Sequence, residues 1–184
     1  MKHLYYIRHG ESVMNVQHLC SGTTDTPLTD LGIQQATNAG DSIKKLKLVF
    51  DAIISSPLRR AKDTAYTIAE TINFPTTSIE ITEDLIERNF GYLEGKNFTK
   101  EIGITIEFYY AHPRCIDHVD GVETLAELHT RAEKLVAYLQ SRPEDTILLV
   151  GHSAFLRSLQ RVLHEHPFDH PLDYTQNATL IKLL

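Results

Sequence analysis

Short apolar runs alternate with amphipathic segments along most of the chain. One run, residues 147–150, is apolar at every position, which is typical of a central strand covered by helices on both faces. Runs with the length and composition of β-strands occur at residues 3–7, 52–55, 78–81, 146–150 and 178–183. These runs are the predicted strands.

Helical periodicity fills the intervals between the predicted strands. The apolar stripe over residues 58–72 follows Ser56, a natural N-cap, and Pro57, a natural first helical residue. Thr124 and Glu127 have the spacing of a capping box at the start of another stripe. Further helices are expected from residue 29 to about residue 46, over residues 125–139 and after His152.

The alternation of strands and helices predicts an α/β fold with a largely parallel sheet. Residues 90–122 fit neither pattern, and segments of that length without regular structure are usually functional. No internal repeat, low-complexity tract or Pro/Gly/Ser-rich linker interrupts the chain. Residues 1–184 are therefore expected to form a single domain with a variable insert at about 90–122.

Composition and charge exclude several classes of protein. The 184 residues are 42% hydrophobic and 23% charged, which is a soluble globular profile. The formal charge of −6 at pH 7 argues against a broad basic surface for nucleic acid. No apolar run approaches the ~18 residues of a membrane span, no signal-peptide pattern opens the chain, and Cys20 and Cys115 give no disulfide framework. We expect a cytoplasmic protein with no nucleic-acid or membrane partner.

Cationic side chains follow three of the predicted strands. Arg8 and His9 come directly after the first strand. Arg60 follows the second strand near a helix start, and His152 follows the buried fourth strand. Because ligands of such sheets bind beyond the carboxyl ends of the strands, these side chains are expected to meet at one edge. Helix N-termini and arginine forks bind phosphate dianions, so the sequence predicts a local phosphate site.

An ordered set of motifs accompanies these cations. The run Arg8-His9-Gly10-Glu11-Ser12 resembles the signature of the histidine phosphatase (phosphoglycerate mutase-like) superfamily. The resemblance continues in order to about residue 160 through Asn15, Ser21-Gly22, Asp25, Pro27-Leu28-Thr29, Gly32, Gln35-Ala36, Ser55-Ser56-Pro57-Leu58-Arg59-Arg60-Ala61, Thr64-Ala65, Glu87, Gly91, Glu94-Gly95, Gly121, Glu123-Thr124 and Gly151-His152. Each short motif is weak alone, and the ordered set is very specific.

The resemblance implies a three-layer α/β sandwich, phosphoglycerate mutase-like, with a mostly parallel central sheet flanked by helices. It implies a metal-independent phosphatase without a cofactor that hydrolyses a small phosphorylated metabolite and covers it with the insert. His9 would be the nucleophile that becomes phosphorylated, and Glu87 would be the general acid. The residues implied to bind phosphate or substrate are Arg8, Asn15, Ser21, Gly22, Arg60 and His152. Arg8, Arg60 and His152 would also act in catalysis.

The chemistry of phosphoryl transfer agrees with these roles. A histidine attacks phosphorus as a neutral imidazole, and neighbouring guanidinium groups favour that form. Arginines and a second histidine hold the charge on the phosphoryl oxygens in the transition state. The leaving alcohol needs a proton, and water then attacks the phosphohistidine with the same carboxyl group as base. Arg59, next to Arg60, is expected to point away from the pocket.

A phosphoglycerate mutase of the same family is the first competing hypothesis. Mutases carry a longer insert before the second histidine, and here Ser153 and Ala154 stand where they usually have a Gly-Asn pair. Acidic residues outnumber fixed cations in this insert, although Arg88 or Arg114 would still serve one anionic group of a substrate. A phosphatase that releases inorganic phosphate is therefore predicted.

A serine hydrolase and a non-catalytic phosphate-binding module are more remote hypotheses. Residues 151–155 resemble the nucleophile elbow of serine hydrolases around Ser153, but Phe155 replaces its final glycine. A non-catalytic module is disfavoured because the core catalytic positions are intact. The aromatic run at residues 108–110 is either core or the wall of a substrate pocket, and Cys20 is expected to be an ordinary thiol. Zinc could in principle bind at either of two clusters, His112 with Cys115 and His118, or His164 with His166 and His170, but we expect both to be solvated loop histidines.

Overall fold

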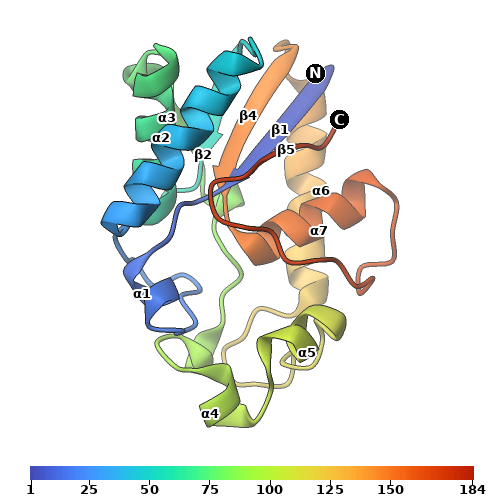
Figure 1. The fold of residues 1–184 in the computed structure, drawn as a ribbon. Coiled ribbons are helices and arrows are strands. Elements are labelled where there is room, and N and C mark those ends of the chain that lie inside the picture. The colour runs from blue at the N-terminus through green and yellow to red at the C-terminus, as the bar shows by residue number, and fades with distance from the viewer.

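A computed structural model describes all 184 residues and places a five-stranded sheet between helices (Figure 1). The strands are β1 (His3–Arg8), β2 (Ala52–Ser55), β3 (Glu80–Ile81), β4 (Thr146–Gly151) and β5 (Leu180–Lys182). Their order across the sheet is β3-β2-β4-β1-β5. All neighbouring pairs are parallel except β1 and β5, which are antiparallel at one edge. The predicted α/β sandwich with a mostly parallel sheet is confirmed.

Seven α-helices connect these strands. They are α1 (Val13–Val16), α2 (Asp30–Lys45), α3 (Arg59–Ile72), α4 (Phe98–Ile102), α5 (Ile106–Ala111), α6 (Leu125–Ser141) and α7 (Ser153–Leu163). The predicted capping box is confirmed, because Thr124 and Glu127 exchange both of its hydrogen bonds at the start of α6. None of the helices has the length and apolar character needed to cross a membrane.

The start of α3 differs from the prediction. The helix begins at Arg59 with Leu58 at the N-cap, and not at Pro57 after a Ser56 cap. The Ser56 hydroxyl lies 2.7 Å from Nε2 of His152 and accepts the Leu58 N–H at 3.3 Å. A residue far away in sequence therefore engages the side chain that the local pattern assigned to the helix cap.

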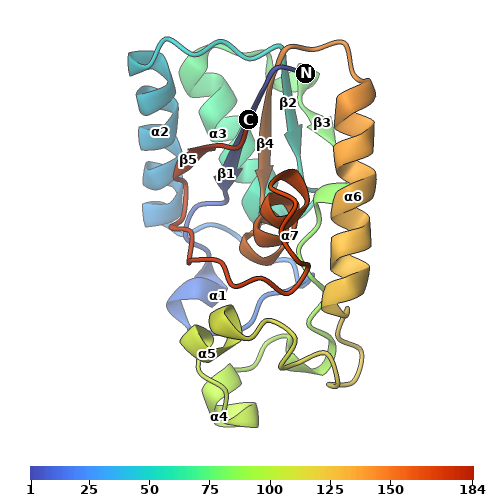
Figure 2. The ribbon, with the colours of Figure 1, turned by 90° about the vertical axis from the view of Figure 1, so that its right-hand side faces the viewer.

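Each face of the sheet is covered by a pair of helices, as Figure 2 shows in a view turned from that of Figure 1. Alternate residues of β1 point to opposite faces. Leu4 and Tyr6 belong to the core shared with α6 and α7, whereas Tyr5 and Ile7 belong to the core shared with α2 and α3. Burial on both faces explains why the central strands are apolar throughout. The helices therefore leave only the ends of the strands open to a ligand.

Residues 90–122 extend away from this sandwich and return to it at the point where they leave. A β-bridge between Phe90 and Val122 joins the two ends of this segment. Between them lie the short helices α4 and α5, capped by the side chains of Asn97 and Thr105. Figures 1 and 2 both place α4 and α5 beyond the carboxyl ends of β1 and β4, together with α1. The segment predicted as an insert thus faces the carboxyl ends of the strands, where the cationic side chains were expected.

Candidate active site

A cavity of about 810 Å³ lies beyond the carboxyl end of β1, between the start of α7 and the insert. This volume is in the range of small-molecule sites. Predicted site residues that line it are Arg8, His9, Asn15, Ser21, Gly22, Arg60 and Glu87. The remaining one, His152, is fully buried, with its ring centroid 5.2 Å from that of His9. The structure therefore brings all the predicted site residues together.

His9 is held in one orientation and one tautomer. Its Nδ1 lies 2.7 Å from the carbonyl oxygen of Gly10, so Nδ1 carries the proton and donates it to that acceptor. Nε2 is left with a lone pair and accepts a long hydrogen bond of 3.3 Å from Nε of Arg60. Burial and the charges of Arg60 and Arg8 hold the pKa of His9 well below its ordinary value of 6.5. His9 is therefore a neutral imidazole with its lone pair beside a cation.

Arg8 and Arg60 keep their positive charge free of ion pairs. The two Nη atoms of Arg60 donate to the carbonyl oxygens of Thr24 and Gly22, at 2.9 and 2.7 Å. Arg8 donates from Nη1 to the carbonyl of Thr175 at 2.7 Å. Burial lowers the pKa of Arg60 to about 10, which still leaves it charged near neutral pH. Carbonyl oxygens orient these guanidinium groups without cancelling their charge.

His152 is oriented through both its ring and its backbone. The hydroxyl of Ser56 has no other acceptor, so it donates to Nε2 of His152 at 2.7 Å and leaves the proton on Nδ1. The hydroxyl of Tyr6 accepts the His152 N–H at 2.7 Å and donates to the His152 carbonyl at 3.0 Å. Burial and the neighbouring charge of Arg60 lower the pKa of His152 well below its ordinary value. A neutral ring with a free Nδ1–H therefore lies beside His9.

Glu87 is placed at the amino end of α7. Its Oε1 accepts the backbone N–H groups of Arg88 and Phe155 at 2.9 and 3.0 Å, and its Oε2 accepts that of Ala154 at 3.1 Å. The first turn of a helix has N–H groups without helical partners, and the carboxylate satisfies two of them. Glu87 is consequently fixed on the cavity wall by the same helix start that follows His152.

Three buried polar atoms in this cluster have no hydrogen-bond partner in the protein: Arg8 Nε, Ser21 Oγ and His152 Nδ1. Buried polar groups are nearly always paired, so three unpaired atoms in one cluster indicate a polar ligand. Asn15 adds a further donor, because its Oδ1 accepts the Ser12 N–H and its Nδ2 has no partner. These groups suit the oxygens of a tetrahedral anion.

The match to known proteins extends over nearly the whole chain. The family model of the histidine phosphatase superfamily, branch 1, matches residues 4–184. The chain belongs to the histidine phosphatase superfamily. Its predicted resemblance to that family is confirmed.

Relatives of this histidine phosphatase include phosphatases and mutases. The uncharacterized phosphatase PhoE of Bacillus subtilis is 34% identical over 155 residues, which are 83% of this chain and 72% of PhoE. A solved structure of a mycobacterial glucosyl-3-phosphoglycerate phosphatase with VO3 is 26% identical and covers 99% of this chain and 90% of its own, with a TM-score of 0.83. The 2,3-bisphosphoglycerate-dependent phosphoglycerate mutase of Borreliella burgdorferi is 40% identical over 97 residues, which are 53% of this chain and 39% of the mutase. Its similarity to these phosphatases identifies this chain as a phosphoric monoester hydrolase.

Sequence reasoning did not identify three residues at or beside the active cavity: Arg157, Tyr174 and Asn177. Asn177 donates to the carbonyl of His9 at 2.8 Å, and the ring of Tyr174 lies 5.0 Å from Cζ of Arg8. Arg157 of α7 is 2% exposed and also lines the cavity. Its spacing of one helical turn from Ser153, next to His152, is the signal that places it there.

The expectation that Arg88 is available to a substrate is wrong. Arg88 is fully buried and paired with Asp117. Its other donors bond the carbonyls of Glu123 and Pro113 and the hydroxyl of Tyr109. The guanidinium group of Arg88 is therefore engaged by residues of the protein and is not free to bind a substrate. Arg59, as expected, points elsewhere and pairs with Asp63.

The aromatic run of the insert serves both as core and as cavity wall. Tyr109 is buried beside Phe90 and Phe98 and also reaches the cavity, and Tyr110 is half-buried on the cavity wall. Phe108 is 49% exposed and lies outside the cavity.

The geometry does not support a serine nucleophile or a zinc site. The hydroxyl of Ser153 bonds Arg157 rather than a histidine, as a serine nucleophile would require. No three His, Cys, Asp or Glu side chains gather closely enough to hold a metal, in either of the two histidine clusters or elsewhere. Burial raises the pKa of Cys20, which keeps it a thiol.

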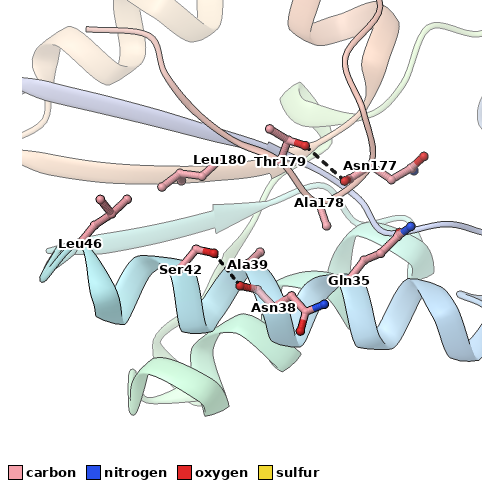
Figure 3. A pocket seen from close by; sticks show the side chains of 9 residues that line it. All are labelled: Gln35, Asn38, Ala39, Ser42, Leu46, Asn177, Ala178, Thr179 and Leu180. Atoms are coloured by element: carbon pink, nitrogen blue, oxygen red, sulfur yellow. Dashed lines mark hydrogen bonds between the residues drawn. The ribbon is translucent and has the colours of Figure 1, made fainter.

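A second hollow, of about 450 Å³, lies between α2 and the segment that leads into β5 (Figure 3). Its lining residues are Gln35, Asn38, Ala39, Ser42, Leu46, Asn177, Ala178, Thr179 and Leu180. None of them is ionisable, so this hollow offers neither a nucleophile nor an acid for phosphoryl transfer. Its wall instead includes Asn177, which positions His9 from outside the active cavity.

Proposed function

We propose that this protein hydrolyses a small phosphorylated metabolite through a phosphohistidine formed on His9. The observation that carries the proposal is the environment of His9: a neutral ring, a lone pair on Nε2 that accepts only a long hydrogen bond from Arg60, and two arginines without ion pairs beside it. A phosphate dianion is the ligand that such a cluster of charges favours. A neutral imidazole is the form that attacks phosphorus.

In the first step, Nε2 of His9 forms a bond to phosphorus as the ester P–O bond breaks. Arg8, Arg60 and the Nδ1–H of His152 hold the phosphoryl oxygens, where negative charge spreads in the transition state. Glu87, which must carry a proton once the phosphate dianion is bound, donates that proton to the oxygen of the leaving alcohol, a contribution of about 10²–10⁴-fold in rate. The alcohol leaves, and the phosphoryl group remains on His9.

In the second step, water attacks the phosphohistidine while Glu87 takes one of its protons. The N–P bond breaks, inorganic phosphate leaves, and His9 and Glu87 return to their starting forms. Asn15 and Ser21 contribute neutral donors at the same cavity. Because two arginines supply the positive charge that a metal ion provides in other phosphatases, we propose that neither step requires a metal.

We also propose that residues 1–184 act as one domain whose insert at about 90–122 covers the substrate. The bridge between Phe90 and Val122 ties the ends of the insert together. Insert residues that line the active cavity include Phe98, Thr105, Tyr109 and Tyr110.

Phosphoglycerate mutation is the second candidate, supported by the mutase relative of 40% identity over part of the chain. A mutase must bind a second anionic group while keeping the phosphohistidine away from water. The insert offers little for this, because Arg88 is buried and paired and Arg114 lies 60% exposed outside the cavity. Hydrolysis is therefore favoured.

Trapping of the intermediate tests the proposal. Radiolabelled p-nitrophenyl phosphate and a rapid quench should label the wild-type protein on His9, with a label stable to alkali and labile to acid. His9→Ala should lose the label and at least about 10³-fold in kcat/KM. His3→Ala, an exposed histidine on the same strand, is the matched control and should retain both.

Two results would contradict hydrolysis through His9. The first is turnover of His9→Ala near the wild-type rate. The second is interconversion of 2- and 3-phosphoglycerate, primed by a bisphosphoglycerate, that runs much faster than phosphate release. The second result would assign the protein to the mutases.

A further inference from the structure

Glu94 is a half-buried acidic residue of the insert that the proposed phosphoryl-transfer steps do not use. Backbone hydrogen bonds hold this part of the insert against the loop at residues 20–24. Cys20 donates its N–H to the carbonyl of Lys96 at 2.8 Å, and Gly95 donates to the carbonyl of Cys20 at 2.8 Å. Glu94 is therefore fixed beside a loop that lies far away from it in the sequence.

The Glu94 carboxylate gathers the donors of this loop. Its Oε1 accepts the N–H groups of Thr23 and Phe90 at 2.8 and 3.1 Å, and its Oε2 accepts the N–H and the hydroxyl of Thr24 at 2.9 and 2.6 Å. The Thr23 hydroxyl donates to Oε1 as well, at 3.0 Å. Donors that surround a carboxylate in this way favour its ionised form, so Glu94 carries a negative charge near neutral pH.

The same loop holds Arg60 from its other side. The carbonyl oxygens of Gly22 and Thr24 accept the two Nη atoms of Arg60, at 2.7 and 2.9 Å. The Gly22 carbonyl and the Thr23 N–H belong to one peptide group, and in a trans peptide these two groups point in opposite directions. Glu94 and Arg60 therefore bind opposite ends of the same peptide group.

This peptide group links the two charges without an ion pair between them. The positive end of its dipole faces the Glu94 carboxylate, and its negative end faces Arg60. Hydrogen bonds in such a chain polarise and strengthen one another. Gly22 has φ of +49°, and a Cβ atom at this position would overlap the Glu94 carboxylate, so the close approach requires glycine.

The direction of the Arg60 guanidinium group matters for the chemistry at His9. A guanidinium group is planar, so fixing both Nη atoms also fixes the direction of Nε. That Nε lies 3.3 Å from Nε2 of His9, the atom proposed to attack phosphorus. The loop that Glu94 gathers also carries Ser21, whose buried hydroxyl has no partner in the protein and lines the active cavity.

We propose that Glu94 is a positioning residue of the active site, which acts through the peptide group between Gly22 and Thr23 to hold Arg60 toward the phosphoryl group. Glu94 does not line the active cavity, so its effect on the rate passes through the groups that the loop carries. The inference rests on the proposed phosphatase function and adds to it the residue that sets the direction of Arg60.

A double-mutant cycle between Glu94 and Arg60 tests this role. Glu94→Gln keeps the size of the side chain but places an amide NH₂ against the N–H donors of the loop. It should lower kcat/KM for p-nitrophenyl phosphate by about 10–100-fold and raise the inhibition constant of orthovanadate, an anion similar to phosphate, by a comparable factor. Arg60→Lys removes the guanidinium fork. In that background Glu94→Gln should change both quantities by no more than about twofold, because no fork is left to position.

Thr24→Val is a milder second variant that removes one hydroxyl bond to Glu94 and keeps both N–H bonds of the loop. It should lower kcat/KM by about 2–10-fold, and this loss should also disappear in the Arg60→Lys background. Circular dichroism at the assay temperature verifies that each variant is folded. If Glu94→Gln does not fold, the cycle between Thr24→Val and Arg60→Lys decides the question by the same criterion.

Glu127→Gln is the matched control for the loss of a carboxylate. Glu127 accepts the N–H and the hydroxyl of Thr124 at 2.8 and 2.8 Å, but it does so at the start of α6 and outside the active cavity. Its replacement should lower Tm and leave kcat/KM and the inhibition constant of orthovanadate as in the wild type.

Equal fold-losses in the wild-type and Arg60→Lys backgrounds would show a merely structural role and overturn the inference. A loss of kcat/KM with unchanged inhibition by orthovanadate would overturn it as well. Additive losses together with a labelled His9 in the wild type would leave the phosphatase proposal standing. Coupled changes in orthovanadate inhibition without a labelled His9 would instead support the role of Glu94 and overturn the phosphohistidine.

Discussion

Replacing Tyr6 by phenylalanine tests whether a buried hydroxyl on β1 orients His152. Tyr6 is fully buried, and its hydroxyl bonds both backbone groups of His152, the N–H at 2.7 Å and the carbonyl at 3.0 Å. Phenylalanine removes these two bonds and keeps the ring. The His152 carbonyl still accepts the Leu156 N–H at 3.0 Å, but the His152 N–H loses its partner.

The cost follows from this asymmetry. A buried N–H left unpaired costs about 1–3 kcal/mol, and the second lost bond adds about 0.5–1.5 kcal/mol. We therefore expect Tyr6→Phe to lower the free energy of unfolding by about 2–4 kcal/mol. At about 2–4 °C per kcal/mol for a chain of this size, Tm should fall by about 4–16 °C. Because His152 loses its backbone anchor beside His9, kcat/KM should fall by about 10–100-fold.

Tyr5→Phe is the matched control for this experiment. Tyr5 is the preceding residue of β1, faces the other core and packs on Phe50 with ring centroids 5.6 Å apart. The Tyr5 hydroxyl makes no hydrogen bond in the protein, so its removal should change neither Tm nor kcat/KM by much. Thermal unfolding followed by circular dichroism and p-nitrophenyl phosphate turnover measure the two effects. If Tyr6→Phe matched Tyr5→Phe in both, the positioning role would be refuted.

Two further predictions concern pH and metal ions. Burial opposes ionisation of Glu94, but hydrogen bonds from Thr24, Thr23 and Phe90 hold its pKa below the ordinary 4.5. The Glu94 carboxylate therefore stabilises the folded protein above pH 4.5, and this stabilisation is lost as the pH falls through the pKa of Glu94 in the folded state. The Tm difference between wild type and Glu94→Gln should therefore be full near neutral pH and shrink below 4.5, and a difference independent of pH in thermal melts would contradict this. EDTA should leave phosphate release unchanged, whereas a loss that magnesium restores would show that metal-independent catalysis is wrong.

Regular elements were predictable because their signals are local. Apolar runs located all five strands, and the Thr124 and Glu127 pair located the start of α6, which carries both capping bonds. The start of α3 was not predictable, because the Ser56 hydroxyl bonds a residue from the other half of the chain. α4 and α5 were missed because segments of 5 and 6 residues are too short to show a helical stripe.

The residues of the active cavity also fall into those that the sequence predicts and those that it does not. Residues that follow strands, such as His9 and His152, were predictable because parallel strands bring their carboxyl ends together. Arg157 was missed because it looks like an ordinary polar residue of an amphipathic helix, whereas α7 is buried on nearly all sides. The use of Arg88 inside the insert was also hidden, since its partner Asp117 lies 29 residues away in a segment without periodicity. Pairing across loops is what sequence patterns leave undetermined.

Two kinds of arginine explain how a chain of net charge −6 can offer the anion site that we propose. Some arginines are neutralised by carboxylates and join distant segments: Arg88 with Asp117, Arg131 with Glu123, and Arg142 with Glu80 and Glu144. The arginines of the active cavity are instead held by carbonyl oxygens or a hydroxyl: Arg8 by Thr175, Arg60 by Thr24 and Gly22, and Arg157 by Ser153. A carbonyl fixes the direction of a guanidinium group while leaving its full charge for the ligand. In the active cavity, the choice of acceptor therefore leaves the charge of the arginines available for the substrate that we propose.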